Sequence, residues 1–503
     1  QESLVIKIFG SRSFVSFVVL FLAVFATIIF IWLIFPKEPA PVSLRILGDS
    51  FSGYSTFRDP DFKEALKKSQ IGLTYEDELD QAKRAEELKS GKADLILTTL
   101  DQFIRQSTYS SGKIVGLIDR SNGADAVLLN TPKYPNLNSL EDLQQFIKIE
   151  NSQGRKPNIA LAQNTPSEFL AFMLTTKEHF KLSDFQIINK KDAKEVWQYL
   201  TQLQDAPVAV LWEPYVTQAR KQGYTVVFSS KEKPRVIIDV IVASNKSIDS
   251  KSDNISKLLE IYYNRIHERI FDPSLMDRQI SKDDKNLSSE DAKAIRESIQ
   301  FFTLPQSHHW LSKNKPEEKI KYIISLLNLV GKPPQESQKF FQPQELQQFY
   351  QPATAAKNVE KLHDSCKTTS GNNIDEFKEI CKFFRLLDVT KKPKIGEVKF
   401  DERSGKLKDQ SKQILDELVE VIEVYDPKTV AVKVTGHASG SQGSSLNNKL
   451  SKERAKVVGQ YLKEQLEKYN IKDEGKSVWY PLGKVPPDDP LQSRAEIRLI
   501  PRQ

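Results

Sequence analysis

Short apolar runs alternate with amphipathic stretches through most of the chain. Runs such as SLRILGD, ADLILTT, DAVLLN and VAVLW are separated by polar segments in which apolar residues recur at helical spacing. Strands that alternate with helices are typical of α/β domains with parallel or mixed sheets. The hydrophobic pattern therefore predicts an α/β multidomain protein whose main domain extends over residues 43–330.

A long apolar run lies near the start of the chain, from Phe14 to Phe35. Its 22 residues carry no charge, and at about 1.5 Å per residue they reach about 33 Å, enough to span a bilayer. A cleaved signal peptide is the alternative, but its apolar core is usually about 7–15 residues long. We therefore expect residues 1–42 to form a cytoplasmic tip, a single transmembrane helix (14–35) and a proline-rich tether.

The composition limits the number of domains and the kinds of partner. A chain of 503 residues is too long for one ordinary domain. Its 73 basic and 66 acidic residues are interspersed, with a net charge of +7, which argues against nucleic-acid binding. A stretch rich in proline and glutamine begins at Gly331, so we expect a connector over residues 331–392 before a last domain at 393–503.

Both cysteines, Cys366 and Cys381, lie in this connector. In an oxidising compartment they would form a disulfide worth roughly 3 kcal/mol in the chain-entropy model. Two free thiols are the alternative, which a cytosolic location would favour. Because a membrane span places the bulk of the chain outside the cytoplasm, we expect the disulfide. None of the known metal-ligand spacings occurs, and we expect neither a metal nor a cofactor.

The last domain contains a strand, a turn rich in Gly and Ser, and an amphipathic helix, in the sequence VAVKVTGHASGSQGSSLNNKLSKERAKVVGQYL. Arg454 is in phase with Leu450 and Val458, so it points toward the packed side of this helix. A buried charge needs a partner or a ligand. A structural ion pair, with Glu496 as the candidate partner, and a ligand contact are both consistent with this position.

This C-terminal segment resembles the peptidoglycan-binding domain of the outer-membrane protein A family. The resemblance rests on VKFDERSGKL, Gly436-His437, Asn447, Arg454-Ala455 and the ending SRAEIRLIP. It implies an α+β domain that contacts peptidoglycan through Ser439, Asn447, Arg454 and Arg494.

One position of the family's binding motif differs in this chain. In the family, an aspartate and the arginine of the Arg-Ala pair hold the amino and carboxylate groups of diaminopimelate. Arg454 matches that arginine, but Ser439 stands at the aspartate position and Ala438 replaces the usual threonine. Serine supplies no countercharge, and charged hydrogen bonds are about twice as strong as neutral ones. We therefore expect peptidoglycan binding to be weak, altered or absent.

The main domain resembles a type 2 periplasmic solute-binding protein, of the branch that includes nitrate-, taurine- and sulfonate-binding proteins. The resemblance covers residues 44 to about 310 and rests on Phe51-Ser52-Gly53-Tyr54, GKADLILTT, DRSNGADAVLL and VAVLWEPYVTQA. It implies two α/β lobes that close on a small solute. The chain would cross between the lobes near Asn122–Ala126 and return near Val236–Val242.

Local chemistry selects the candidate residues of this cleft. Thr165 and Pro166 suit the start of a helix, whose free N–H groups favour an anionic ligand group. Strand ends are where ligands collect in open α/β sheets, and aromatic side chains would wall the pocket. The candidates are Tyr54, Thr98, Thr99, Thr165, Ser167, Trp212 and Glu213. Ordinary helix capping and core packing are the alternative explanation for each, and Glu213 accepts either from a cationic ligand or from nearby backbone.

Several functions are compatible with these domains. Thiamine-precursor synthases share the solute-binding fold but use a cysteine-rich cluster, and residues 43–330 contain no cysteine, so we expect no enzymatic activity. An ion-driven stator needs an ionisable residue in its span, and Phe14–Phe35 has none. We expect a single-pass protein of the bacterial inner membrane, mostly periplasmic, which couples a solute-binding module to peptidoglycan as a receptor or transporter accessory. The alternative is a scaffold, or a subunit of a larger complex with other membrane proteins, in which both modules have lost their ligands.

Overall fold

The computed structural model describes two separate parts of the chain. The first is residues 41–304 with gaps at 178–179, 203–205, 233–236 and 285–286, followed by 306–307, 310, 320 and 323–327. The second is residues 394–502 with gaps at 402, 424–426, 429, 440–444, 477–485 and 487–488. Apart from Phe21, the expected span lies outside the described residues, as do the connector 331–392, Cys366 and Cys381. In the part described, no helix combines the length and apolarity needed to cross a membrane.

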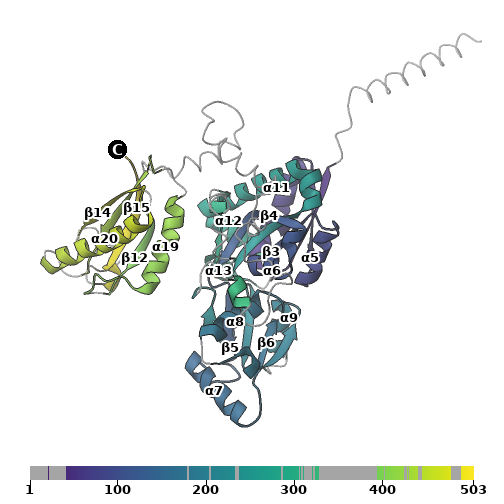
Figure 1. Ribbon diagram of the computed structural model, residues 1–503, viewed down its shortest axis with the longest axis horizontal. Coiled ribbons are helices and arrows are strands. Elements are labelled where there is room, and N and C mark those ends of the chain that lie inside the picture. Colours follow the sequence, from purple (N-terminus) through teal and green to yellow (C-terminus); the bar gives the residue numbers. More distant parts are fainter. Residues whose placement is uncertain are drawn as a thin grey trace, which may run out of the picture.

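The first lobe is built on a six-stranded sheet of order β11-β4-β10-β3-β1-β2 (Figure 1). Its strands are β1 (Val42–Gly48), β2 (Ile71–Asp77), β3 (Leu95–Thr99), β4 (Gly112–Ser121), β10 (Ile238–Ser244) and β11 (Ile299–Phe301). Its helices are α3 (Ser55–Arg58), α4 (Pro60–Lys68), α5 (Gln81–Lys89), α6 (Leu100–Arg105), α11 (Asn245–Phe271), α12 (Pro273–Asp283) and α13 (Ser289–Ser298), with 3-10 turns η1 (Ser52–Tyr54) and η2 (Thr108–Ser110).

The second lobe is built on a five-stranded sheet of order β7-β6-β8-β5-β9. Its strands are β5 (Asp125–Leu129), β6 (Asn158–Ala162), β7 (Gln186–Lys190), β8 (Val208–Trp212) and β9 (Thr225–Ser229). Its helices are α7 (Leu140–Ser152), α8 (Pro166–Lys177), α9 (Ala193–Gln202) and α10 (Tyr215–Lys221), with the 3-10 turn η3 (Leu182–Asp184).

The two lobes share one internal topology. Three parallel strands, β2-β1-β3 in the first lobe and β7-β6-β8 in the second, are followed in each sheet by an inserted antiparallel strand. That inserted strand, β10 or β5, comes directly after the chain has crossed from the other lobe. The crossings fall between Ser121 and Asp125 and between Ser229 and Ile238. The expected architecture of two α/β lobes is therefore confirmed.

Alternating residues of each strand enter two different cores. In β5, Ala126 and Leu128 belong to one apolar cluster, while Val127 and Leu129 belong to the other. Since successive strand residues point to opposite faces, each sheet is covered on both sides. This double burial explains why the strands read as nearly continuous apolar runs in the sequence.

The C-terminal domain is an α+β unit with a four-stranded sheet of order β12-β15-β13-β14. Its elements are β12 (Lys394–Lys399), α19 (Asp409–Glu423), β13 (Val430–Gly436), α20 (Ser445–Gln465), β14 (Asn470–Gly475), the 3-10 turn η6 (Pro490–Gln492) and β15 (Arg494–Pro501). A Cβ atom at Gly436 would lie 2.0 Å from the carbonyl oxygen of Ser451, so glycine lets α20 pack directly on the end of β13. The expected α+β class is confirmed for this domain.

Candidate ligand site between the two lobes

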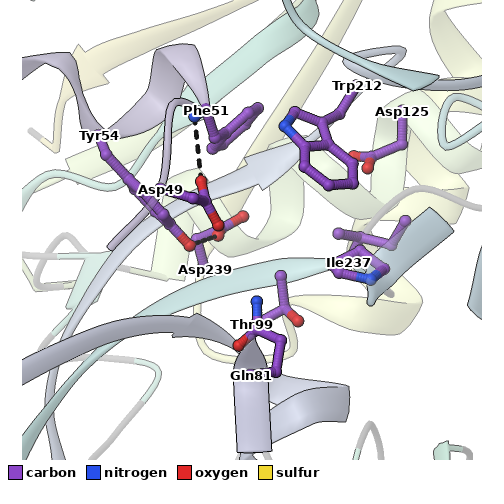
Figure 2. A pocket seen from close by; sticks show the side chains of 10 residues that line it. Asp49, Phe51, Tyr54, Gln81, Thr99, Asp125, Trp212, Ile237 and Asp239 are labelled. Atoms are coloured by element: carbon purple, nitrogen blue, oxygen red, sulfur yellow. Dashed lines mark hydrogen bonds between the residues drawn. The ribbon is translucent and has the colours of Figure 1, made fainter. Parts of the chain in front are cut away.

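A small cavity lies where the carboxyl ends of the parallel strands of both lobes meet. Its volume is about 20 Å³, which is room for about one water molecule. It is lined by Asp49, Phe51, Tyr54, Gln81, Thr99, Asp125, Pro166, Trp212, Ile237 and Asp239 (Figure 2). Because both lobes contribute, a larger ligand enters only if the lobes move apart.

Equivalent strand positions of the two lobes meet at this cavity. In the first lobe, Thr99 ends β3 and stands opposite Asp239 of β10. In the second lobe, Trp212 ends β8 and stands opposite Asp125 of β5. Each lobe thus presents one aspartate from its inserted strand and one side chain from the end of its third parallel strand.

Asp49 is the lining carboxylate with a basic partner. A guanidinium nitrogen of Arg84, on α5, lies 3.0 Å from Asp49 Oδ2, and the Arg84 side chain is fully buried. Arg84 also donates to the carbonyl oxygens of Glu78 and Leu97. The Phe51 backbone N–H donates to Asp49 Oδ1 at 3.0 Å (Figure 2). These contacts fix the turn that carries Phe51 and Tyr54.

Asp239 belongs to a pair of buried carboxyl groups on neighbouring strands. Asp119 of β4 stands opposite it, and the two residues are 0 % and 2 % exposed. Burial raises the pKa of both groups well above the ordinary value, and the charge of Asp119 adds to the rise at Asp239. The Tyr54 hydroxyl donates to Asp239 Oδ1. Two such close carboxyl groups retain a proton between them.

Two carboxyl groups of the second lobe are also buried. Burial, with a smaller contribution from the charges of Asp101 and Asp49, raises the pKa of Asp125 to about 7. Burial likewise raises the pKa of Glu213 to about 7. Within the described ranges, no Lys or Arg side chain forms an ion pair with Asp119, Asp125 or Asp239. The cavity is therefore acidic.

The structure brings together three of the residues that the sequence singles out. Tyr54, Thr99 and Trp212 line the cavity. Trp212 is 5 % exposed, and its indole Nε1 has no hydrogen-bond partner among the described residues. Figure 2 shows the ring at the side of the cavity opposite Tyr54. These residues come from η1, β3 and β8, and so from both lobes.

The other four candidates do not line this cavity. Thr98 and Thr99 are neighbours in β3 and point to opposite faces of the sheet, so Thr98 does not line the cavity. The Thr98 hydroxyl donates to Gln81 Oε1 at 3.0 Å. Glu213 accepts from the backbone and the hydroxyl of Thr217 at 3.0 and 2.9 Å, so it serves the first turn of α10. Ser167 is fully buried behind Pro166 and does not line the cavity.

Thr165 performs the capping role predicted for it. Its Oγ1 accepts from the Ser167 backbone N–H at 3.2 Å and donates to the Ala162 carbonyl at 2.7 Å. It lines a second, larger cavity of about 630 Å³ that shares Gln81 with the first. That cavity is bordered by residues 77–81 of the first lobe and by residues 163–165 and 189–191 of the second. Thr165 therefore borders the same cleft farther from the central cavity.

The carboxylates of the cavity were not among the candidates predicted from the sequence. Asp239 interrupts the apolar run VIIDVIVAS, and Asp125 opens the run DAVLLN. A charged residue inside a fully buried strand is costly unless it has a role, and that signal was present in both runs. Within the described parts of the chain, no three His, Cys, Asp or Glu residues are arranged to hold a metal ion.

In the C-terminal domain, Arg454 of α20 has no exposed surface. Its guanidinium donates to the backbone carbonyls of Asp401, Ser404 and His437 at 2.8, 2.9 and 2.8 Å. Glu496, the candidate partner of Arg454, does not pair with it. Glu496 instead accepts from Arg494 and Arg498 at 2.8 and 3.0 Å. Arg454 thus joins the loop after β12 to the end of β13.

The remaining peptidoglycan candidates lie close to this point. Ser439 is 7 % exposed, and its hydroxyl lies 3.0 Å from that of Ser493. Asn447 is also 7 % exposed and lies in the first turn of α20. Arg494 is buried, and it donates to Gln492 as well as to Glu496. Its guanidinium is therefore already engaged in the structure.

Several solved structures are similar to the main domain. The alkanesulfonate-binding protein SsuA from Xanthomonas axonopodis pv. citri, bound to MOPS, is 13% identical, with a TM-score of 0.45; the match covers 58% of this chain and 93% of that one. The periplasmic nitrate-binding protein NrtA from Synechocystis PCC 6803 is 12% identical, with a TM-score of 0.47, over 70% of this chain and 91% of that one.

The C-terminal domain has matches of its own. The OmpA-like domain of FopA1 from Francisella tularensis subsp. tularensis is 29% identical, with a TM-score of 0.19, over 21% of this chain and 72% of that one. A comparison with curated protein sequences gives no match. The OmpA family matches residues 399–476. The chain therefore carries an OmpA-family domain at its C-terminal end.

Proposed function

We propose that this protein binds a small solute between its two α/β lobes and holds this binding module between the bacterial inner membrane and the cell wall. It acts as a receptor or a transporter accessory rather than as an enzyme. The proposal rests mainly on one observation: Asp125 with Trp212 and Asp239 with Thr99 meet around a single cavity from equivalent positions of two lobes. Packing alone does not need buried carboxyl groups at both positions.

The anchoring part of the proposal rests on the two ends of the chain. The uncharged run Phe14–Phe35 is long enough for a membrane span. The OmpA-family domain supports association with peptidoglycan. Together they would keep the solute-binding lobes in the periplasm, next to the inner membrane and at a distance from the cell wall that the connector 331–392 limits.

A structural role is the second candidate function. Two observations favour it: the cavity has room for about one water molecule, and Ser439 stands where the OmpA family has an aspartate. In that case the lobes would stay closed, and the protein would serve as an envelope scaffold or as a subunit of a larger membrane complex. Ligand binding by the purified protein separates the two candidates.

The test is thermal or chemical unfolding of the complete chain, purified in a mild detergent, with a panel of small cations, anions, zwitterions and neutral solutes. A compound that binds the closed lobes, at a concentration of 100 times its dissociation constant, should add about 2.7 kcal/mol to the free energy of unfolding. The variant Thr99→Trp should abolish this gain, because an indole does not fit the closed cavity. Thr201→Trp, at the exposed end of α9, is the matched control.

The scaffold function makes the opposite prediction for this experiment. If no compound stabilises the folded wild-type protein, the solute-binding proposal is wrong. The same conclusion follows if Thr99→Trp responds to a compound in the same way as the wild type, because the compound then binds outside the cavity.

A further inference from the structure

The cavity between the lobes has an excess of acidic groups. Asp49, Asp125 and Asp239 line it, and no Lys, Arg or His is among its lining residues. Asp49 is balanced by Arg84 at 3.0 Å. Asp125 and Asp239 have no basic partner in the described part of the chain, and Asp119 stands directly behind Asp239. An anionic ligand would therefore face two further carboxyl groups without a countercharge.

The start of α8, which the sequence suggested as a site for an anionic group, already has a carboxylate in its own first turn. Pro166 at the start of α8 lines the cavity, but Glu168 lies in the first turn of the same helix and is fully buried. A Glu168 carboxylate oxygen accepts from the Asn164 backbone N–H at 3.1 Å and from Arg105 at 2.7 Å. Because this carboxylate already occupies the positive end of the helix, the start of α8 does not by itself favour an anionic ligand group.

Aromatic side chains form the rest of the wall. The rings of Phe51 and Tyr54 meet edge to face, with centroids 5.4 Å apart, and Trp212 stands on the other side (Figure 2). Aromatic faces attract organic cations, whereas metal ions prefer a shell of oxygen ligands. The Trp212 indole N–H is buried without a partner among the described residues. It is a donor, so a ligand that satisfies it carries an acceptor atom.

We propose that the solute is a small organic cation, an ammonium group with a hydroxyl or carbonyl oxygen nearby. Asp125 releases its proton as the cation binds, and the proton shared by Asp119 and Asp239 stays on Asp119. Asp125 and Asp239 then supply the countercharges, one from each lobe, so that the cation links the two lobes when they close. Phe51, Tyr54 and Trp212 surround the cationic group, and the Trp212 N–H donates to its oxygen. This inference rests on the proposed function, because it names the class of solute for the same cavity.

Three matched probes test the charge of the ligand in isolation. Ethanolamine, ethylene glycol and glycolate are of similar size and share a hydroxyl group, but they are positive, neutral and negative at neutral pH. Choline adds a larger cation, and methanesulfonate and nitrate add further anions. Binding is measured by titration calorimetry on the complete chain at constant ionic strength. We expect ethanolamine or choline to bind at least tenfold more tightly than ethylene glycol, and no binding of the three anions.

The protein variants test which residues recognise the cation. Asp125→Asn and Asp239→Asn should each weaken cation binding about ten- to hundredfold, as expected for the loss of a charged contact. Asp249→Asn is the matched control, since Asp249 is exposed on α11 and does not line the cavity. Trp212→Phe keeps the aromatic face but lacks the N–H. It should therefore weaken the binding of ethanolamine more than the binding of tetramethylammonium, which has no acceptor oxygen.

The outcomes distinguish this inference from the proposed function. Tight binding of an anion that Thr99→Trp abolishes would overturn the inference that the solute is a cation, while the proposal that the lobes bind a solute would stand. Cation binding that Asp125→Asn and Asp239→Asn leave unchanged would also overturn it, because the cation would then lie elsewhere. A folded protein that binds no compound of any charge would overturn both proposals together.

Discussion

The two-lobed domain should lose stability as the pH rises from 4 to 8. Burial raises the pKa of Asp125 to about 7 in the folded protein, from a usual value of 3.8. Between these values the folded state holds a proton that the unfolded state has released, so the free energy of unfolding falls as the pH rises. With about 1.4 kcal/mol per pH unit, Asp125 alone accounts for a loss of about 4 kcal/mol over this range.

The groups around Asp125 determine how the prediction is measured. Asp49, Asp101 and Asp119 face it with like charges, and the pKa of Glu213 is raised as well. Carboxylates whose pKa is lowered by basic partners, such as Asp94 and Asp291, have the opposite effect: the protein loses their stabilising contribution as the pH falls. The measured quantity is therefore the difference between the wild type and Asp125→Asn.

Hydrogen exchange of the second-lobe strands gives the local free energy of unfolding for both proteins. Asp125→Asn should remove about 4 kcal/mol of the pH-dependent loss between pH 4 and pH 8. Asp249→Asn, at an exposed site on α11, should leave the loss unchanged. Identical pH profiles for Asp125→Asn and the wild type would show that Asp125 is ionised in the folded protein at all these pH values.

Arg454→Ala should destabilise the C-terminal domain by roughly 3–5 kcal/mol, the cost of leaving buried polar groups without their charged partner. The Arg454 guanidinium donates to three carbonyl groups that belong to Asp401, Ser404 and His437. Alanine leaves these carbonyls without that donor. Arg454→Lys keeps the charge but not the planar arrangement of donors, so it should recover part of the loss.

Arg498→Ala is the matched control for this prediction. Arg498 pairs with Glu496 at 3.0 Å, but its side chain is 38% exposed, and exposed ion pairs contribute about 0–1 kcal/mol. The measurement is hydrogen exchange of the buried strand β13. If Arg454→Ala exchanges as slowly as Arg498→Ala, the three carbonyl contacts do not stabilise the domain.

We expect the C-terminal domain to bind peptidoglycan weakly. With Ser439 at the aspartate position of the family, one charged contact to diaminopimelate is missing, which corresponds to a loss of about ten- to hundredfold in affinity. Co-sedimentation with purified peptidoglycan should therefore be weak for the wild type and stronger for Ser439→Asp. Tight wild-type binding that Ser439→Asp leaves unchanged would place the wall contact at another surface.

Much of the fold follows from the periodicity of the sequence. Runs such as VAVLW and AVLL are apolar at every position because both sheet faces are covered, and they form β8 and most of β5. The helix α20 of the C-terminal domain was equally readable. Strand order depends on contacts between distant segments, and local pattern gives no information about it. The equivalence of β5 and β10 therefore became visible in the structure.

The site was less predictable than the fold, for physical reasons. Thr98 and Thr99 share one strand end, and only the register of β3 against β10 decides which of them faces the cavity. Glu213 has a helix-capping partner four residues later, which a sequence does not distinguish from a ligand contact. Asp239 could be noticed in the sequence as a carboxylate within an apolar run. Its neighbour Asp119 lies 120 residues earlier in the chain, so their pairing could not be predicted.

The distance between the two lobes tests the central claim most directly. Spin labels at Lys67→Cys on α4 and Lys148→Cys on α7, both exposed, would report this distance by pulsed electron spin resonance, with Cys366 and Cys381 replaced by serine. Lobes that bind a solute between them should show a longer, broader distribution without ligand and a shorter, narrower one at saturating ligand, with no such change in Thr99→Trp. A single distribution that no bound compound alters would contradict the account and favour a scaffold whose lobes stay closed.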